Sequence, residues 1–401
     1  MRDLLESAAK TSDEVVALYR RIHAEPELGL HLPRTQAAVL DAIDGLPLEV
    51  RTGCSVSSVV ADLHGDGDGP TVLLRADMDA LPLPEATGLQ YASAVERAMH
   101  ACGHDAHVAM LVGAAHVLSA RRRSLRGTVR FAFQPGEEGF HGARSMIEEG
   151  LLDDPRVDAA FALHVSPNLP TGSVWTRGGP IMASADVLTV TVTGKGGHAS
   201  TPYLAGDPVP VAAEIVLAIQ SYVTRRVNPF DPVVATIAQV NAGTASNVIP
   251  ERVELVGTLR AVSPGGRKLA TEGMARLVAG IADAHGMRAE LRVDEGYPPT
   301  VNDAGAAEFV LRVAGGLLGA RRTGRMPAPV MGAEDFSYVL ERRPGALAFL
   351  GVCPPGVRPS DAHSCHSNRM VLDEDALATG VAVHCALATE YLASGGRFAT
   401  G

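Results

Sequence analysis

The sequence predicts an α/β protein in which helices cover a mostly parallel sheet, with a second, ferredoxin-like domain inserted into the first. Three observations carry this prediction. Short, almost continuously apolar runs occur at residues 70–75, 129–133 and 159–163, as in strands buried on both faces. Strict alternation of apolar and polar residues begins at residue 187, as in a half-exposed strand. The α/β pattern returns after residue 297, so the first domain is discontinuous.

The first segment contains helix and strand signals that end in polar residues. Thr11 to Glu14 form a capping-box sequence, which predicts a helix that reaches about His23. The three buried strands end in RADMD, QPGEEG and HVSP. Open α/β sheets bind ligands at the carboxyl ends of their strands, so these endings predict one shared site.

The inserted segment has the element order βαββαβ. Residues 187–193 alternate along a strand, and Asp207–Pro208 supplies the N-cap and first residue of a helix to about Arg225. The remaining elements are strands at 232–240 and 252–262, a helix at 266–285 and a strand at 288–293. This order is the ferredoxin-like split motif.

The domain boundaries follow from these changes of pattern. We expect the inserted domain at residues 185–296, within a discontinuous domain formed by residues 1–184 and 297–401. The last part of the chain should add a helix at 306–318, a strand at 346–352 and a helix at 374–392.

Composition excludes several classes of function. The chain has 401 residues, of which 46% are hydrophobic, and a formal net charge of -10, which argues against nucleic acid or an anionic membrane as a partner. Acidic residues interrupt the N-terminal segment, and no run of about 20 apolar residues is present, so we expect a cytoplasmic protein. Five cysteines, unevenly spread, are too few for a disulfide framework.

The segment MHACGHDAH, residues 99–107, predicts a metal site. Thiolate and imidazole bind borderline transition ions well, and Gly103 between Cys102 and His104 lets both side chains converge. An isolated buried cysteine is usually an inert core residue. Here further candidate ligands follow at strand ends, namely Glu137, Glu138 and His164, and later in the chain His363 and His366.

The adjacent carboxylates Glu137 and Glu138 are expected to have different roles. In an extended segment neighbouring side chains point in opposite directions, so one carboxylate can bind a metal while the other faces an activated water. The alternative is an ordinary acidic loop. Asp77 and Asp79, which follow the first buried strand, are expected to support a ligating histidine.

Nine motifs resemble one family and occur in its order along nearly the whole chain. They are HAEPELG, RADMDALP, MHACGHDAH, QPGEEG, LHV, GKGGHAS, ASNVIP, GAEDFSY and HSNRMVLDEDAL. This set is similar to the hippurate hydrolase and indole-acetyl-amino-acid hydrolase branch of the aminoacylase and carboxypeptidase superfamily.

The resemblance implies roles for individual residues. The ligands of a binuclear metal centre correspond to Cys102, His104, Glu138, His164 and His366, and the general base corresponds to Glu137. The inserted domain corresponds to a lid that often also makes a dimer. His198 corresponds to a lid histidine that donates to the oxyanion, in several relatives from the neighbouring subunit. Asn247 and Arg260 correspond to residues that hold the substrate carboxylate.

Two departures from the family pattern are visible. Relatives usually have an acidic residue after PELG and a proline after the last His-Ser pair, whereas this chain has GLHLPRT at 29–35 and Asn368 after Ser367. His366 still fits the ligand position better than His363, because it keeps its distance to the DEDAL segment.

The sequence therefore predicts a metal-dependent hydrolase that cleaves N-acyl amino acids, such as hippurate or N-acetyl amino acids. The alternatives are a metal-dependent dipeptidase or carboxypeptidase, and a non-catalytic homologue that binds a ligand. A thiolate ligand favours zinc, cobalt or nickel, with manganese also compatible. A homodimer or higher homo-oligomer through the lid is expected, and the acyl and amino-acid specificity stays open.

Overall fold

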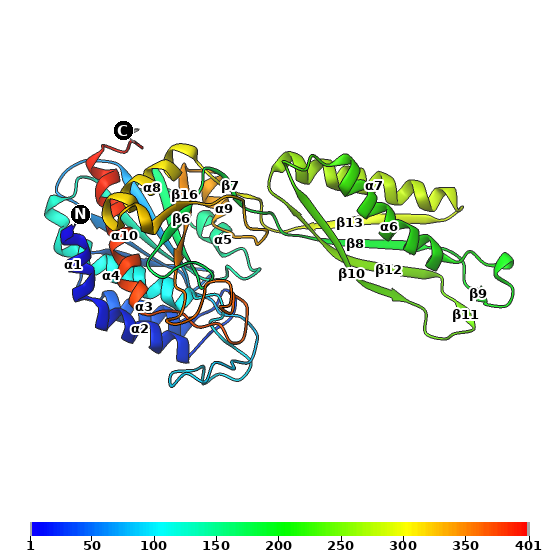
Figure 1. Ribbon diagram of the computed structural model, residues 1–401, viewed down its shortest axis with the longest axis horizontal. Coiled ribbons are helices and arrows are strands. Elements are labelled where there is room, and N and C mark those ends of the chain that lie inside the picture. Colours follow the sequence, from blue (N-terminus) through cyan, green and yellow to red (C-terminus); the bar gives the residue numbers. More distant parts are fainter. Residues whose placement is uncertain (1, 399–401) are drawn as a thin grey trace. The chain divides into compact units, whose positions relative to one another are not determined.

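A computed structural model describes residues 2–398 and divides the chain into two compact units. Of the described residues, the first unit contains 2–179, 301–328 and 335–398. The second unit contains residues 180–300 and 329–334. Figure 1 labels many of the elements of both units.

The first unit is built on an eight-stranded sheet with the order β1-β2-β4-β3-β5-β16-β6-β15. The pairs β3–β4, β3–β5, β5–β16 and β6–β15 are parallel. Strands β3, β4, β5 and β16 are buried over almost their whole length, as predicted for strands covered on both faces. The strands are β1 (Glu49–Thr52), β2 (Val59–His64), β3 (Thr71–Asp77), β4 (Thr128–Gln134), β5 (Ala159–Ser166), β6 (Val174–Thr176), β15 (Thr323–Arg325) and β16 (Gly345–Gly351).

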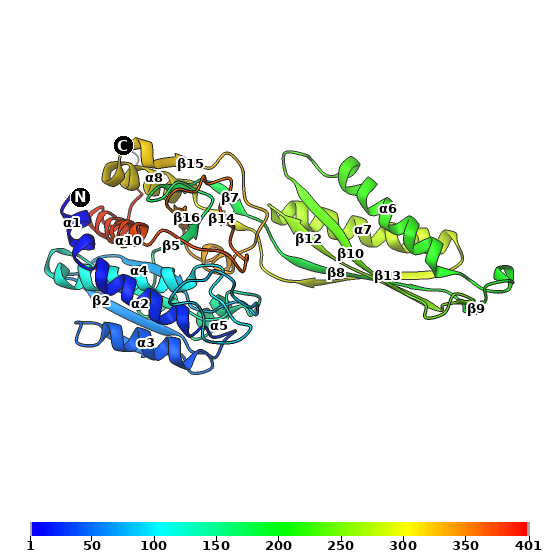
Figure 2. The same cartoon turned by 60° about the horizontal axis from the view of Figure 1, so that its bottom comes forward.

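Helices α4 and α10 pack against this sheet and against each other, and α1 and α2 pack on them (Figure 2). Among the described helices, α10 alone is long and apolar enough to cross a membrane, but 72% of its apolar stretch is buried, as in a core helix. The helices of the unit are α1 (Arg2–Lys10), α2 (Ser12–Ala24), α3 (Pro33–Ile43), α4 (His104–Ala120), α5 (Gly142–Glu148), α8 (Ala304–Leu318), α9 (Ser337–Leu340), α10 (Asp375–Ala393) and the 3-10 turns η1 (Arg122–Ser124) and η3 (Ala320–Arg322).

The second unit has the predicted order βαββαβ. Its four strands pair antiparallel in the order β10-β12-β8-β13, and α6 and α7 pack on one face of the sheet (Figure 1). Leu188, Val190 and Val192 are fully buried beneath these helices, as the alternation predicted. The elements are β8 (Asp186–Thr193), α6 (Pro208–Arg226), β10 (Val233–Ala242), β12 (Arg252–Ala261), α7 (Pro264–Ala284) and β13 (Arg288–Glu295).

Smaller elements complete the chain. They are the paired strands β9 (Gly197–His198) and β11 (Val248–Ile249), the paired strands β7 (Gly179–Met182) and β14 (Thr300–Asn302), and the 3-10 turn η2 (Pro202–Leu204).

The sequence correctly predicted where helix α2 begins. However, the Thr11 side chain does not make the predicted capping hydrogen bond. Helix α2 begins at Ser12, whereas the Thr11 hydroxyl donates to the Ala8 carbonyl at 2.9 Å instead of capping α2. Helix α1, which the sequence pattern did not predict, ends immediately before this point, so the hydroxyl serves the preceding helix.

A buried ionic network joins α2 to the first turn of α4. His23 lies 2.6 Å from Asp105 through Nδ1 and 3.3 Å from Glu85 through Nε2. Burial alone would lower the pKa of His23, but the bonds to Asp105 and Glu85 raise this pKa to about 10. Burial would raise the pKa of Glu85, but its bond to His23 lowers that pKa to about 2. The network is ionised across the neutral range.

We predict that His23→Gln lowers the free energy of unfolding by about 3–5 kcal/mol near pH 6, because two buried carboxylates lose their cation. The stabilisation by His23 is complete below pH 6.5 and disappears as the pH rises towards 10. The stabilisation by Glu85 is complete above pH 4.5 and disappears as the pH falls towards 2. Urea unfolding of the parent and the His23→Gln variant, both in chelator, measures their free energies of unfolding. The difference between these free energies should become smaller as the pH rises from 6.5 to 10. A constant difference would contradict the ionic network.

Candidate metal centre

The predicted shared site lies at the carboxyl ends of three neighbouring strands. Strand β3 pairs in parallel with β4 on one side and with β5 on the other. Asp77, Gln134 and His164 therefore lie at or near the same edge of the sheet. The segment that follows β3 carries Asp79, and the segment that follows β4 carries Glu137 and Glu138.

His104 presents one ring nitrogen for a ligand. Its Nδ1 donates to the Asp79 carbonyl at 2.8 Å, which leaves the lone pair of the neutral ring on Nε2. Nε2 is buried and has no hydrogen-bond partner within residues 2–398. Burial would lower the pKa of His104, but Asp77 and Asp79 raise it well above its usual value. Without an ion this position attracts a proton, which is the behaviour of a cation site.

The backbone conformation of Gly103 allows the Cys102 side chain to lie close to His104 and His164. Its φ of +81° is left-handed, and a Cβ there would lie 2.4 Å from Val165 Cγ2. Cys102 Sγ lies 3.5 Å from His164 Nε2, and His164 Nδ1 donates to the Val165 carbonyl at 2.7 Å. The interaction of the Cys102 thiol, as donor, with the Cys365 sulfur raises the pKa of Cys102, and burial raises it further. A cation would have to displace the thiol proton.

Glu137 and Glu138 lie in a turn, so the predicted extended conformation is wrong. The Glu137 amide donates to Asp79 Oδ1 at 2.8 Å and the Glu138 amide to Asp79 Oδ2 at 2.9 Å. Gly136 and Gly139, with φ of +72° and +88°, permit this turn. Both carboxylates consequently approach one imidazole, with Glu137 Oε2 3.9 Å and Glu138 Oε1 4.0 Å from His104 Nε2.

His366 joins the group from the far end of the chain. Its Nε2 lies 3.2 Å from Glu138 Oε1, and its amide donates to the Ala101 carbonyl at 2.8 Å. The φ of +69° is unusual for a residue with a side chain, and such strain is concentrated at functional sites. His363 is exposed and belongs to no metal-binding group among the described residues.

The five predicted ligands form two triads that share Cys102. One triad contains Cys102, His104 and His164, and the other contains Cys102, Glu138 and His366. Within each triad the ligand atoms all lie within 4.8 Å of one another. Glu137 forms a third group with His104 and Glu138. Thiolate, imidazole and carboxylate donors so close together fit a borderline divalent cation, because desolvated donors of this kind need a positive partner.

A buried network around Asp335 supports the site, and sequence reasoning gave Asp335, Arg75 and Gln134 no role in it. Asp335 accepts from Arg75 at 2.9 Å, from Gln134 at 2.8 Å and from the Ala143 amide at 2.9 Å. Arg75 also pairs with Asp77 at 2.6 Å, and Asp77 accepts from His107. An arginine inside an otherwise apolar strand was the signal in the sequence, because such a charge requires buried acids.

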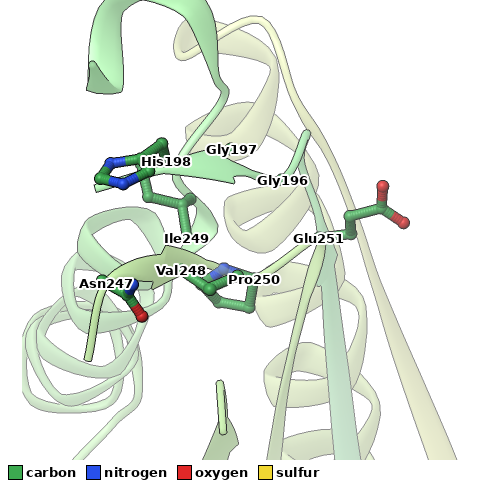
Figure 3. Close-up of a pocket in the computed structure, with 8 residues that line it drawn as sticks. All are labelled: Gly196, Gly197, His198, Asn247, Val248, Ile249, Pro250 and Glu251. Carbon is green, nitrogen blue, oxygen red and sulfur yellow. The ribbon is translucent and has the colours of Figure 1, made fainter. Parts of the chain in front are cut away.

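The second unit brings His198 and Asn247 together at one end of its sheet. Val248 pairs with His198, and the Ala199 amide donates to the Asn247 carbonyl at 3.0 Å. Figure 3 shows both exposed side chains at a groove that Gly196, Pro250 and Glu251 also line. His198 Nδ1 accepts from the Ser200 amide at 3.1 Å and lies 2.8 Å from the Ser200 hydroxyl, which places the proton of the neutral ring on Nε2.

Arg260 lies at the opposite end of this sheet. On β12, Arg252 pairs with Thr193, five residues before His198, whereas Leu259 pairs with Asp186. Arg260 is eight residues beyond Arg252, which corresponds to about 27 Å along the strand. Within one chain, His198 and Asn247 therefore cannot contact the same small substrate as Arg260.

The sheet and the two ligand triads define the class of a metallohydrolase of α/β fold, and comparison with known proteins gives the family. The chain belongs to peptidase family M20/M25/M40, whose model matches residues 73–390.

Three similar proteins illustrate this membership. The chain is 36% identical to thermostable carboxypeptidase 1 of Saccharolobus solfataricus, over 97% of this chain and 98% of that protein. It is 38% identical to IAA-amino acid hydrolase ILR1-like 2 of Arabidopsis thaliana, over 95% and 85%. The crystal structure of the Bacillus subtilis YXEP protein, titled a dinuclear metal binding peptidase, superposes with a TM-score of 0.84 at 32% identity and covers 96% of this chain and 99% of that one. The chain is a metal-dependent amidohydrolase.

We predict that Asp79→Asn weakens the binding of a divalent ion about 10–100-fold, because an amide has one acceptor oxygen for the two amides of Glu137 and Glu138. Competition with a chromogenic chelator measures the affinity. Asp158→Asn is the matched control, since Asp158 accepts the Thr71 amide at 2.8 Å at the other end of the same strand. Equal affinities of the Asp79 and Asp158 variants would exclude the positioning role.

Proposed function

We propose that the enzyme hydrolyses the amide bond of N-acyl amino acids, using two divalent ions per chain held by Cys102, His104, Glu138, His164 and His366. The observation that carries the proposal is the pair of triads that share the Cys102 thiol, with the Glu137 carboxylate beside them. The Cys102 thiolate and the Glu138 carboxylate would together offset part of the charge of two such ions. Zinc, cobalt, nickel and manganese are all compatible with this donor set.

The bound ions would polarise the scissile carbonyl and make a water molecule more acidic. Glu137 then accepts the proton of the attacking water and passes it to the nitrogen of the departing amino acid. His198 donates from Nε2 to the oxygen of the tetrahedral intermediate, a role that fits the tautomer set by Ser200. Asn247 and Arg260 bind the carboxylate of the amino acid.

The separation of Arg260 from His198 and Asn247 favours a site completed by a second chain. We assign residues 1–184 and 297–401 to the metal-binding catalytic domain, and residues 185–296 to a lid that also forms the dimer. In this arrangement the lid of one chain supplies Arg260, and the partner subunit supplies His198 and Asn247. The two ends of the sheet then act on different active sites.

The outer edge of the second unit offers a surface for this dimer. Strand β10 is an edge strand, and Val234 and Val240 on it are 45% and 63% exposed. Leu217 on the neighbouring helix α6 is 72% exposed, and Phe230 in the connection between α6 and β10 is 95% exposed. An unpaired edge with apolar side chains favours pairing with a second copy. We place this dimer in the cytoplasm, where the free state of all five cysteines is maintained.

A peptidase activity is the second candidate, because the carboxypeptidase of Saccharolobus solfataricus is among the similar proteins. A dipeptide carries an ammonium group next to the scissile carbonyl, and two nearby cations would repel it. We therefore predict a higher kcat/KM for hippurate and N-acetyl amino acids than for dipeptides with the same C-terminal residue. Faster cleavage of the dipeptides in metal-reconstituted enzyme would establish the peptidase instead.

The two adjacent carboxylates should respond differently to substitution. Glu137→Gln should keep its metal and lose about 10²–10⁴-fold in kcat, because the amide cannot accept the proton of water. Glu138→Gln should lose metal, since it removes a charged ligand of the second triad. Elemental analysis alongside turnover checks both results. Metal loss in the Glu137 variant alone would reverse the two roles.

Sharing of the lid predicts complementation between two inactive chains. His198→Ala should keep its metal and lose about 10²–10³-fold in kcat, as expected for one oxyanion donor. Mixed with Glu137→Gln chains under subunit exchange, it should regain activity, because one site of each heterodimer has both residues. Absence of recovery, with exchange confirmed by differently tagged chains, would contradict the sharing of His198.

A further inference from the structure

An exposed aromatic side chain lies beside the candidate metal centre, and the proposed mechanism gives it no role. Among the described phenylalanines only Phe140 and Phe230 are exposed, and Phe140 follows the candidate ligand Glu138 by two residues. Successive Cα atoms are about 3.8 Å apart, so the Cα atoms of Glu138 and Phe140 are separated by at most about 7.6 Å. The Phe140 side chain, which is 51% exposed, is therefore tethered close to the ligands.

Leu30 extends this apolar surface from a second segment of the chain. A Cβ atom added to Gly136 would lie 2.5 Å from Leu30 Cδ2 and 3.1 Å from Phe140 Cβ, so both side chains lie beside this glycine. A Cβ atom added to Gly29 would lie 3.4 Å from the Phe140 ring. The two glycines thus let the segments meet, and the half-buried Leu30 and the exposed Phe140 form one surface. We call Gly29, Leu30, Gly136 and Phe140 the Phe140 patch.

Backbone hydrogen bonds hold both segments of the Phe140 patch in place. The Gly142 amide donates to the Gly136 carbonyl at 3.0 Å, which closes the loop that carries Phe140. The Ala80 amide donates to the Glu27 carbonyl at 2.8 Å, which anchors the other segment to the chain that follows β3. An apolar group that packs on a surface held in this way orders few additional bonds, so little conformational entropy opposes its binding.

We propose that the Phe140 patch binds the acyl chain of the substrate, and that the enzyme prefers N-acyl amino acids with an extended alkyl or arylalkyl acyl group over their N-acetyl counterparts. The inference rests on the proposed function, because it takes the scissile carbonyl to lie at the metal centre. The acyl chain continues from that carbonyl away from the amino acid. An acetyl group offers one methyl group to the patch, whereas a longer chain removes more apolar surface from water.

The chemistry of the Phe140 patch distinguishes the two ends of the substrate. The amino-acid end carries a carboxylate, which would lose hydration against an apolar surface without gaining a hydrogen bond. An apolar acyl chain carries no charge and is stabilised by the same contact. The patch therefore favours an uncharged, apolar acyl chain and disfavours an acyl group that ends in a second carboxylate.

Three glycine conjugates test this preference. N-acetylglycine, N-hexanoylglycine and N-(phenylacetyl)glycine all carry a saturated carbon next to the carbonyl, so their amides have similar intrinsic reactivity, and differences in kcat/KM report binding of the acyl chain. With metal-reconstituted enzyme, we expect kcat/KM to be at least about 10-fold higher for each longer conjugate than for N-acetylglycine. We call this quotient the acyl ratio.

Substitutions in the patch should lower the acyl ratio in a graded way. Phe140→Ala should bring it close to one, and Phe140→Leu should keep part of it because an apolar side chain remains. Val50→Ala is the matched control, since Val50 is an exposed apolar residue on β1 at the edge of the same sheet, and its loss should leave the ratio unchanged. Metal content is measured in every variant, because Phe140 lies close to Glu138.

Binding is measured separately from turnover in a Glu137→Gln background. Titration calorimetry should give a lower Kd and a more negative heat-capacity change for N-(phenylacetyl)glycine than for N-acetylglycine, as burial of apolar surface requires. Addition of Phe140→Ala to this background should remove both differences. A lower Kd that persists without the aromatic ring would contradict the role of Phe140.

The remaining outcomes separate this inference from the proposed function. If the enzyme cleaves all three conjugates with an acyl ratio near one, or if a high ratio survives in Phe140→Ala, the patch does not bind the acyl chain, while the proposed function stands. If Phe140→Ala weakens the dimer in sedimentation experiments and leaves the ratio unchanged, the ring is a subunit contact instead. If the enzyme cleaves dipeptides but none of the conjugates, the proposed function fails and this inference fails with it.

Discussion

The carboxylate of Asp79 is the contact on which the candidate metal centre depends. One oxygen accepts the amide of Glu137 and the other the amide of Glu138, while the Asp79 carbonyl accepts from His104 Nδ1. A single residue after β3 thus fixes the turn after β4 and the imidazole at the start of α4. Because each bond is made by a rigid backbone or ring donor, the ligand atoms are held in place before an ion arrives, and less ordering remains to oppose binding.

The sequence predicted the architecture because its patterns are local. Strand β3 is buried throughout and mostly apolar, β8 alternates, and Asp207 caps α6 by accepting the Val209 amide. The turn at Glu137 was not predictable in this way, since its geometry comes from Asp79, 58 residues earlier. The role of Asp335 and the position of Cys365 beside Cys102 depend on contacts between segments 192 or more residues apart, which no local pattern encodes.

The length of strand β12 determines which residues of the second unit can lie close together. The residues proposed to bind the substrate carboxylate were predicted as a pair, but β12 and its register place Arg260 and Asn247 at opposite ends of the second unit. In the dimer that we propose, the two ends of one lid would serve different active sites, so each active site would be complete only after assembly. The exposed edge of β10 supports the dimer that we propose, and the left-handed backbone of His366 lies in the first unit, whose candidate ligands would hold the metal.

X-ray absorption at the zinc edge of the reconstituted enzyme tests the central claim, that one thiolate belongs to the metal centre. The account predicts a sulfur scatterer at about 2.3 Å together with nitrogen and oxygen scatterers near 2.0–2.2 Å. The sulfur contribution should disappear in Cys102→Ser and persist in Cys365→Ser. A shell of nitrogen and oxygen alone in the parent enzyme, or a sulfur signal that depends on Cys365 and not on Cys102, would contradict the account.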